Sequence, residues 1–414
     1  MKILFLSSYT TNNEIPLLSQ CKSGFGYMTY DIAKGVAKTE RVDALLLNYR
    51  YDSFVVDNIH FKENSVSLFL RNIYHCCSPW IVFRLWRGYR MSIRSLVRIT
   101  YCWLASGRYY QLIKEEGYDI VHIHGCELYD EIYVDICRRL NRKFVITLHG
   151  LNSFSDSVDL ERAGKKYEKD FLGRVVNGEF PITVISSGIK KTIQNYYGIK
   201  KCDNISVICN SFSFEESKQA YNVVDIRVKC HIPENAKIIL YVGNVSRNKN
   251  QEQLIRAFDL LPTEVKDNSF ILFCGRNIEA GYQLDDMVKA SGYKERLILC
   301  GNIDKELMPA YFKQADAVVL LSIVEGFGLS LIEGMHFGLP CMTFEDLDAF
   351  EDIYDENAVV ALSSRDDKTV AEGLLRLVTS EWDKEKIILH SRKFENKAMT
   401  DNYINQYKEI VYDR

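Results

Sequence analysis

The chain has 414 residues, of which 47% are hydrophobic, enough to fill two cores of ordinary size, so we expect two globular domains. The formal net charge of −3 does not favour binding to nucleic acid. The 12 cysteines show no C-x-x-C pair and no zinc spacing, and only Cys76 and Cys77 are adjacent, which favours reduced thiols in a cytosol.

The opening run from Met1 to Ser7 is too short for a signal peptide and resembles a first strand. No apolar run reaches transmembrane length. Apolar runs then alternate with helical stretches, as in parallel α/β sheets. We expect strands at residues 2–7, 42–48, 119–123, 143–147, 181–185, 204–208, 238–243, 269–274, 296–300, 316–321 and 339–343. The polar stretch from Ser211 to Pro233 is the expected linker, and residues from Trp382 onward are expected to be helical.

A glycine-rich loop follows the first expected strand. Lys22-Ser-Gly24-Phe-Gly26-Tyr27 opens a helix that we expect to reach Ala37. The loop lacks a third glycine, and no clear acid follows the second strand, so a dinucleotide-binding fingerprint is incomplete. Backbone at such a loop can still approach a phosphate.

Histidines end two of the expected strands. His122 and His124 close one strand, and the run Val145-Ile-Thr-Leu-His149-Gly closes the next. An imidazole at a strand end could donate a hydrogen bond to a ligand hydroxyl. It is more often a structural residue, and we favour that interpretation for His122 and His124.

Residues 64–114, the basic segment, contain seven Arg, one Lys, three of the four Trp and no acid, so the segment carries +8 and the remainder −11. Four arginines recur at helical spacing (Arg87, Arg90, Arg94, Arg98), and apolar residues line another face (Ile93, Val97, Tyr101, Leu104). This pattern predicts a surface that binds an anionic membrane. The alternatives are a partly buried helical pair whose arginines bind the acidic remainder and, third, RNA binding without a recognition module.

Two strand-end loops in the second half favour an anion site. Gly243 is followed by Asn244-Val-Ser-Arg247-Asn-Lys249, and we favour cations there that hold a diphosphate over the alternative of solvated loop charges. The second loop is Glu325-Gly-Phe-Gly-Leu-Ser-Leu-Ile-Glu333. A helix starting near Gly328 would point its free N–H groups at an anion, with the two acids about 10 Å apart. The plain alternative is that Glu333 is an ordinary first-turn acid.

The E-x7-E arrangement in a strand-loop-helix resembles the retaining GT-B glycosyltransferases of family 4, the glycosyl transferases group 1, of the bacterial surface-polysaccharide type. The resemblance implies an α/β GT-B fold: two Rossmann-like, doubly wound parallel-sheet domains face a cleft, and a C-terminal helix crosses back. We expect an acceptor-side domain over 1–215, a nucleotide-sugar-binding domain over 216–390 and a C-terminal helix over 391–414 that packs on the first domain.

The resemblance also assigns residues. The Thr-x-His-Gly strand end places His149 beside the donor sugar, and Lys249 falls on the diphosphate-binding lysine. Asn244 stands where the family usually has arginine, and Arg247 is the candidate replacement. The expected catalytic residues are His149 and Glu325. The expected donor-binding residues are Gly24, Gly26, Gly243, Arg247, Lys249, Ile303, Phe327, Gly328, Leu329 and Glu333.

We therefore expect a retaining hexosyltransferase that uses a UDP- or GDP-type sugar and a glycan acceptor, which we expect to be lipid-linked, in polysaccharide biosynthesis. Neither a metal nor a cofactor is expected, and neither is a nucleic-acid partner. The expected location is cytoplasmic, peripheral on the inner face of the cell membrane. A sugar-nucleotide epimerase, a phosphorylase or a non-catalytic membrane adaptor on the same fold remains an alternative.

Overall fold

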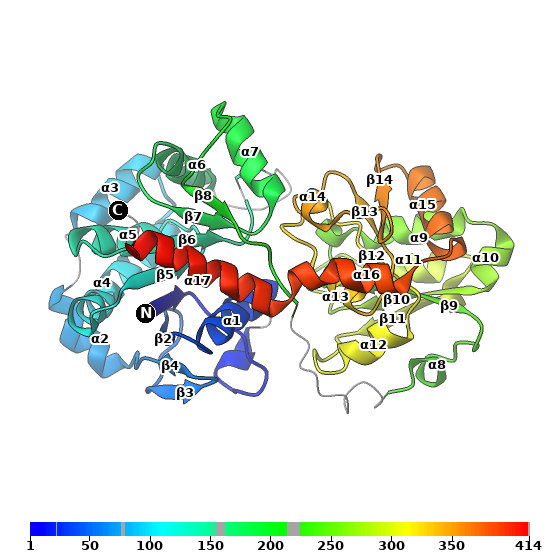
Figure 1. Cartoon of the computed structure of the whole chain (residues 1–414), viewed down its shortest axis with the longest axis horizontal. Helices are drawn as coiled ribbons and strands as arrows, with labels where there is room; N and C mark the ends of the chain where they lie inside the picture. Colours follow the sequence, from blue (N-terminus) through cyan, green and yellow to red (C-terminus); the bar gives the residue numbers. More distant parts are fainter. Residues whose placement is uncertain (22, 76–78, 152, 155–161, 213–223, 413–414) are drawn as a thin grey trace. The chain divides into compact units, whose positions relative to one another are not determined.

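The computed structural model describes residues 1–21, 23–75, 79–151, 153–154, 162–212 and 224–412. Its internal contacts divide the chain into two compact units, each built on a predominantly parallel sheet with helices packed around it (Figure 1). Unit 1 consists of Met1–Asn210 with Asn396–Arg414, and unit 2 consists of Ser211–Glu395.

The sheet of unit 1 has eight strands in the order β3-β4-β2-β1-β5-β6-β7-β8. All neighbours are parallel except β3 and β4. From β1, the chain adds β2 and β4 on one side of the sheet and β5 to β8 on the other, so the order reverses between β1 and β5. Doubly wound folds bind ligands at such a switch point. The strands are β1 (Lys2–Ser7), β2 (Arg41–Leu46), β3 (Phe54–Val56), β4 (Ile59–Phe61), β5 (Ile120–His124), β6 (Phe144–Leu148), β7 (Ile182–Val184) and β8 (Ile205–Val207).

Serines and glycines set the ends of several helices in unit 1. Ser23 caps α1 and Ser186 caps α7 through their side chains, while Gly117 and Gly198 end α4 and α7 in the left-handed conformation. The helices are α1 (Gly24–Val36), α2 (Val66–Asn72), α3 (Trp80–Tyr89), α4 (Ile93–Glu116), α5 (Asp130–Arg139), α6 (Arg162–Val176), α7 (Ser187–Tyr197) and α17 (Asn396–Tyr412).

The sheet of unit 2 has six parallel strands in the order β11-β10-β9-β12-β13-β14. They are β9 (Lys237–Val242), β10 (Ser269–Cys274), β11 (Leu297–Gly301), β12 (Ala317–Val319), β13 (Cys341–Phe344) and β14 (Val359–Leu362). The helices are α8 (Ile226–Lys229), α9 (Gln251–Asp259), α10 (Thr263–Asp267), α11 (Leu284–Ala290), α12 (Met308–Gln314), α13 (Leu329–His336), α14 (Phe350–Ile353), α15 (Asp367–Thr379) and α16 (Lys384–Ser391).

The structure contains all eleven expected strands and three more, β3, β4 and β14. The first two form a hairpin whose turn residues, Asp57 and Asn58, both have positive φ (49° and 62°), as a two-residue type I′ turn requires. The sequence did not indicate these three strands, although it did indicate β7, β8 and β12, which have three residues each.

Helix α17 belongs to unit 1, where it packs against α1 (Figure 1). Its Tyr403 and Tyr407 are fully buried. Thr183 donates a 2.8 Å hydrogen bond from Oγ1 to Oε1 of Gln406, which joins the helix to β7. The chain thus ends as a structural part of the unit in which it begins.

The basic segment folds as α2, α3 and α4, and this corrects the expected arginine run. Helix α3 ends at Tyr89, Arg90 follows in the left-handed conformation (φ 48°), and α4 begins at Ile93 with Ser92 as its cap. Arg87 and Arg94 therefore lie on different helices. Within the described ranges, no helix combines the length and apolar character that crossing a membrane requires.

Two other expectations fall partly outside the described residues. The expected linker includes 213–223, and its later part forms the short helix α8. Cys76 and Cys77 also lie outside the described residues.

Candidate functional site

In unit 2, Asn248 joins the loop after β9 to the loop after β12. Its carbonyl accepts a 2.8 Å hydrogen bond from the N–H of Ile323, and its side chain both accepts from the N–H of Val324 (3.1 Å) and donates to the Val324 carbonyl (3.0 Å). Three hydrogen bonds from one residue hold the two loops in register. The carboxyl ends of these neighbouring strands therefore form one rigid surface.

Lys249 and Glu325 form an ion pair on this surface. Ser322 donates a 3.3 Å hydrogen bond to the same carboxylate oxygen, Oε2 of Glu325. The Lys249 carbonyl accepts from the Tyr241 hydroxyl, which in turn accepts a 3.0 Å bond from Leu321 N–H. The pair is half-buried, so its charges interact more strongly than a surface pair would. The expected diphosphate-binding lysine and the expected catalytic carboxylate thus touch.

Helix α13 begins directly after this loop. Gly328 precedes it at φ 86°, a left-handed conformation that favours glycine, and no side chain in the described part of the chain caps its first N–H groups. Phe327 is buried with its ring 5.8 Å from that of Phe394, so its side chain serves packing. Glu333 is the fifth residue of the helix, beyond the first turn, which removes the plain interpretation of a first-turn acid.

The two expected cations have different carboxylate partners. Arg247 donates from Nη1 to Oε1 of Glu279 (2.6 Å) and from its backbone N–H to Oε2 (2.8 Å), and its side chain is 69% exposed. Asn244, at the family's usual arginine position, is held through its carbonyl by Gln251 Nε2 at 3.0 Å. The loop thus presents Lys249 to Glu325 and Arg247 to Glu279.

Close packing at the end of β9 explains one glycine that the sequence did not single out. A Cβ at Gly275 would overlap the carbonyl of Gly243, so the backbones after β10 and β9 can approach only because Gly275 has no side chain. Ile303, the remaining expected residue of unit 2, is half-buried in the loop after β11.

Sequence reasoning missed Asp348 and Arg365. Arg365 forms a two-bond ion pair with Asp346 (2.9 and 2.7 Å) and donates to the Ser322 carbonyl at 3.2 Å, so it supports the Glu325 loop. Burial, with the charges of Glu325 and Asp346, raises the pKa of Asp348 to about 6. In the sequence Asp348 and Arg365 resemble ordinary surface charges, because nothing local shows that they lie near the Glu325 loop.

In unit 1, the expected catalytic histidine lies against a second histidine. His149 Nε2 is 3.1 Å from Nδ1 of His124, which is buried and has no hydrogen-bond partner at Nε2 among the residues that the structure describes. His122 is satisfied by Thr147 Oγ1 (2.7 Å) and Tyr407 OH (2.6 Å), which agrees with the structural role expected for it. The structure places His124 next to His149, a contact that the sequence did not reveal.

Burial lowers the pKa of His149 to about 4, so its imidazole is neutral at pH 7. Burial also holds the pKa values of His122 and His124 well below the ordinary range. A neutral imidazole can donate a hydrogen bond to a hydroxyl or accept one from it, but it has no positive charge with which to stabilise a phosphate.

The glycine-rich loop lies against His149 through Phe25, whose ring meets the imidazole edge-on at 4.8 Å. Gly24 starts α1, and Gly26 donates from its N–H to Ser23 Oγ at 3.0 Å. A Cβ at Gly26 would overlap Oγ1 of Thr11, so this glycine is also required for packing. The expected residues of unit 1 (Gly24, Gly26, His149) therefore gather in one region, as do those of the Glu325 surface in unit 2.

The described part of the chain contains no group of three or more His, Cys, Asp or Glu side chains arranged to hold a metal ion.

Two family models match this chain. Residues 224–394 match the model described as glycosyl transferases group 1, and residues 74–216 match the model described as glycosyltransferase family 4. Together they span most of both units.

Named relatives and a solved structure agree with the family models. N-acetyl-alpha-D-glucosaminyl L-malate synthase of Bacillus anthracis is 23% identical over 73% of this chain and 77% of its own. The UDP-Gal:alpha-D-GlcNAc-diphosphoundecaprenol alpha-1,3-galactosyltransferase of Escherichia coli is 26% identical over 56% of this chain and 59% of its own. Sucrose-phosphate synthase from Thermosynechococcus elongatus superposes with a TM-score of 0.71 at 16% identity, over 100% of both chains. This last likeness shows the GT-B fold.

Proposed function

Because the chain belongs to the group 1 glycosyltransferases, we propose that it moves a hexose from a nucleotide diphosphate sugar to a glycan hydroxyl with retention of anomeric configuration. The observation that carries the proposal is the Lys249–Glu325 pair beside the uncapped start of α13. A cation and a helix N-terminus together suit the leaving diphosphate, whose charge grows as the glycosidic bond breaks.

The proposed roles follow from position. Lys249 and the backbone N–H groups of residues 327–329 stabilise the diphosphate. Glu325 accepts hydrogen bonds from sugar hydroxyls, and Glu333 accepts them from the ribose. Arg247 contributes only if the diphosphate draws it from Glu279, to which it is bound at 2.6 Å.

In unit 1, neutral His149 is proposed to hydrogen-bond the donor sugar, and Gly24 and Gly26 to allow backbone near the phosphates. The short distance between His124 and His149, 3.1 Å, supports a fixed orientation of the His149 ring. Because His149 is uncharged at neutral pH, its proposed role is hydrogen bonding, without electrostatic stabilisation of the phosphates.

The proposed donor is a UDP or GDP sugar, and the proposed acceptor is a lipid-linked glycan in polysaccharide biosynthesis. Support comes from the Escherichia coli relative, whose name specifies UDP-galactose and a diphosphoundecaprenol-linked acceptor. The basic segment supports a location at an anionic, cytosolic membrane face, because exposed aromatic and aliphatic side chains lie among its arginines.

The first experiment screens UDP, GDP and ADP sugars by thermal unfolding, where saturation at about 100 times Kd adds roughly 2.7 kcal/mol to the free energy of unfolding. Transfer to glycan acceptors follows. Release of nucleotide diphosphate that depends on the acceptor is expected, whereas release without any glycan would favour an epimerase or a phosphorylase. A chain that binds no nucleotide sugar would be an adaptor.

The matched variants are Lys249→Ala and Lys289→Ala, the latter an exposed lysine on α11 that pairs with Asp286 at 3.7 Å. Lys249→Ala should raise the transfer barrier by about 2 to 4 kcal/mol, as the loss of one preorganised cation does. Lys289→Ala should change nothing. A folded Lys249→Ala enzyme with wild-type kcat/KM would refute the assignment.

Calorimetry with free nucleoside diphosphate separates the two acids. Glu333→Gln should weaken nucleotide binding, while Glu325→Gln should leave it nearly intact and impair transfer. Equal losses of nucleotide affinity in both variants would contradict the division of roles.

A further inference from the structure

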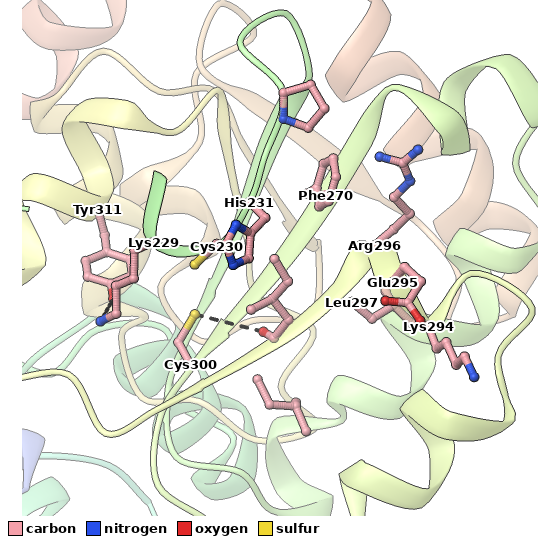
Figure 2. Close-up of a pocket in the computed structure, with 13 residues that line it drawn as sticks. Lys229, Cys230, His231, Phe270, Lys294, Glu295, Arg296, Leu297, Cys300 and Tyr311 are labelled. Carbon is pink, nitrogen blue, oxygen red and sulfur yellow. Dashed lines mark hydrogen bonds between the residues drawn. The ribbon is translucent and has the colours of Figure 1, made fainter. Parts of the chain in front are cut away.

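Three cysteines that are far apart in the sequence meet at the edge of the unit 2 sheet. Cys230 follows α8, Cys274 ends β10, and Cys300 lies in β11, the edge strand. The Cys300 thiol interacts electrostatically with the thiols of both Cys274 and Cys230, and it donates a 4.0 Å hydrogen bond to the Ile298 carbonyl. Cys274 is buried, whereas Cys230 and Cys300 are half-buried and line an open pocket (Figure 2).

A β-bulge places Cys300 in this cluster. The pairing of β10 with β11 runs from Phe273 opposite Leu299 directly to Cys274 opposite Gly301, so Cys300 is an extra residue without a partner on β10. A bulge redirects the side chain of its extra residue. In Figure 2, the sulfurs of Cys230 and Cys300 lie near each other at the pocket wall.

The pocket is basic on one part of its wall and apolar on another. Its volume is about 770 Å³, within the range of sites for small organic ligands. Lys229, His231, Lys294 and Arg296 line it, against a single acid, Glu295, and Phe270 supplies an aromatic surface 4.6 Å from the Arg296 guanidinium. This lining suits an organic anion that carries a group able to react with a thiol.

Cys300 has the electrostatic surroundings of a reactive thiol. A hydrogen bond from Cys274 lowers the pKa of Cys300, and the positive charge of Lys229 and a hydrogen bond from Cys230 act in the same direction. Lys229 is itself held by a 3.2 Å hydrogen bond to Tyr311 OH. Hydrogen bonding with Cys300 raises the pKa of Cys274 far above its ordinary value, so Cys274 stays protonated.

We propose that Cys300 is a redox modification site that reacts with anionic low-molecular-weight disulfides held in this pocket, and that Cys230 resolves the product. The Cys300 thiolate attacks one sulfur of the disulfide RSSR, forms a mixed disulfide and expels RS⁻, which takes up a proton. The Cys230 thiolate then attacks the Cys300 sulfur and expels the second RS⁻. Two protein thiols are oxidised to a Cys230–Cys300 disulfide, and RSSR is reduced to two RSH.

Cys230 is the resolving thiol because it is half-buried on a short connection outside the sheet, where movement toward Cys300 disturbs no strand pairing. Cys274 is buried within β10 and protonated. Cys230 and Cys300 are not among the residues proposed to bind the donor, although the Cys274 carbonyl accepts a 2.9 Å hydrogen bond from the N–H of Gly243. The thiol chemistry does not depend on the proposed transferase activity.

The test uses the full-length reduced protein and glutathione disulfide, whose carboxylates give it net negative charge. After reaction, free thiols are alkylated in denaturant and each cysteine is assigned by peptide mass. Wild type should form the Cys230–Cys300 disulfide, and Cys230→Ser should stop at the Cys300–glutathione mixed disulfide. Cys300→Ser should form neither, and Cys274→Ser should still form the wild-type disulfide.

The charge of the pocket is tested with cystamine, a cationic disulfide. Reaction of wild type with glutathione disulfide should be about tenfold faster than with cystamine at low salt, because a basic pocket concentrates anions. Lys229→Gln with Lys294→Gln should remove most of this preference, and Lys289→Gln, outside the pocket, should not.

Three results would overturn the proposal. These are equal or faster reaction with cystamine, modification of the half-buried Cys21, Cys102 or Cys209 as fast as Cys300 in wild type, and a disulfide that contains Cys274. The wild-type labelling rates decide the question even if a serine variant does not fold.

Discussion

Asp348 shows how a single residue can carry an unfavourable charge next to a candidate site. Burial raises its pKa to about 6, and the negative charges of Glu325 and Asp346 act in the same direction. In the unfolded chain an aspartate has a pKa of about 3.9. The folded protein therefore binds this proton more tightly than the unfolded chain does, and the ionised form of Asp348 costs stability.

Asp348→Asn should therefore stabilise the protein at pH 8 and have little effect near pH 4. Between about pH 4 and pH 6 the folded state holds the proton that the unfolded state has released, so wild-type stability falls as pH rises through this window. Two pKa units correspond to at most about 3 kcal/mol, and partial solvation reduces this. Thermal unfolding of both proteins from pH 4 to pH 8 measures the difference, and a gap that shrinks as pH rises would contradict the assignment.

At the scale of elements, the contact between α1 and α17 joins the two ends of the chain. Gly35 of α1 faces Thr400 of α17, and a Cβ at Gly35 would overlap Thr400 Oγ1. Asn396 Oδ1 lies 3.0 Å from the same Cβ position. A helical glycine is normally unfavourable by about 1 kcal/mol relative to alanine, so its presence here reflects the close approach of the two helices.

Gly35→Ala should destabilise the protein by about 1 to 3 kcal/mol, the usual cost of overpacking. Adding Thr400→Ala removes Oγ1 and should recover most of the loss, which gives a coupling energy measurable by chemical denaturation of all four proteins of the cycle.

Gly88→Ala is the matched control for this cycle. Gly88 also lies in a helix, α3, but a Cβ there would meet nothing within 4 Å. This change should stabilise by up to about 1 kcal/mol through helix propensity. Strict additivity of Gly35→Ala and Thr400→Ala would show that the two helices do not meet at this point.

At the scale of the molecule, the basic segment concentrates +8 in 51 residues of a chain that is otherwise −11. Features of this segment agree in part with each of the two leading interpretations, a partly buried helical pair and a membrane-binding surface. Arg84 and Arg98 reach Glu131 and Glu127 at 3.4 Å, as the buried-pair alternative expects. Arg87, Arg90 and Arg94 are exposed, and within the described ranges no ion pair involves them.

Exposed apolar side chains accompany these free arginines. Trp80, Ile93 and Val97 are 67%, 82% and 64% exposed, on α3 and α4. Exposed aromatic and aliphatic side chains next to basic ones are typical of surfaces that lie on anionic lipid. This combination is the reason that we retain the membrane proposal although Arg87 and Arg94 lie on different helices.

Reversing Arg87, Arg90 and Arg94 to Glu should release the protein from anionic vesicles, since each basic residue near such a surface contributes about 1 kcal/mol. Wild-type binding should also weaken as salt rises, because screening acts over about 8 Å at physiological ionic strength. Reversal of Lys289, Lys368 and Lys386, three exposed lysines of unit 2, is the charge-matched control and should leave binding unchanged.

Sedimentation with vesicles measures this prediction, and activity on a short soluble acceptor checks that the donor site survives. If wild type fails to sediment with anionic vesicles at low salt, the membrane proposal is wrong and the arginines serve packing.

Local sequence alone indicated eleven of the strands that the structure describes, the loops at their ends and several helix starts. Buried parallel strands are continuous apolar runs, and loops at their carboxyl ends can be located without knowing which strands are neighbours. For this reason Lys249, Glu325 and His149 could be placed at strand ends from the sequence, and the family resemblance then selected them as candidates. The break between α3 and α4 was missed because Arg90 adopts the left-handed conformation without a glycine to signal it.

Only the tertiary structure decided which of these residues meet. Lys249 and Glu325 are 76 positions apart, and His124 and His149 are 25 apart. Their contacts depend on β12 lying beside β9 and on β6 lying beside β5. The raised pKa of Asp348 likewise depends on burial and on the charges of Glu325 and Asp346. The three-thiol cluster depends on the segment after α8 lying near β10 and β11. Strand order and register are set by the packing of the whole unit, so no local pattern contains them.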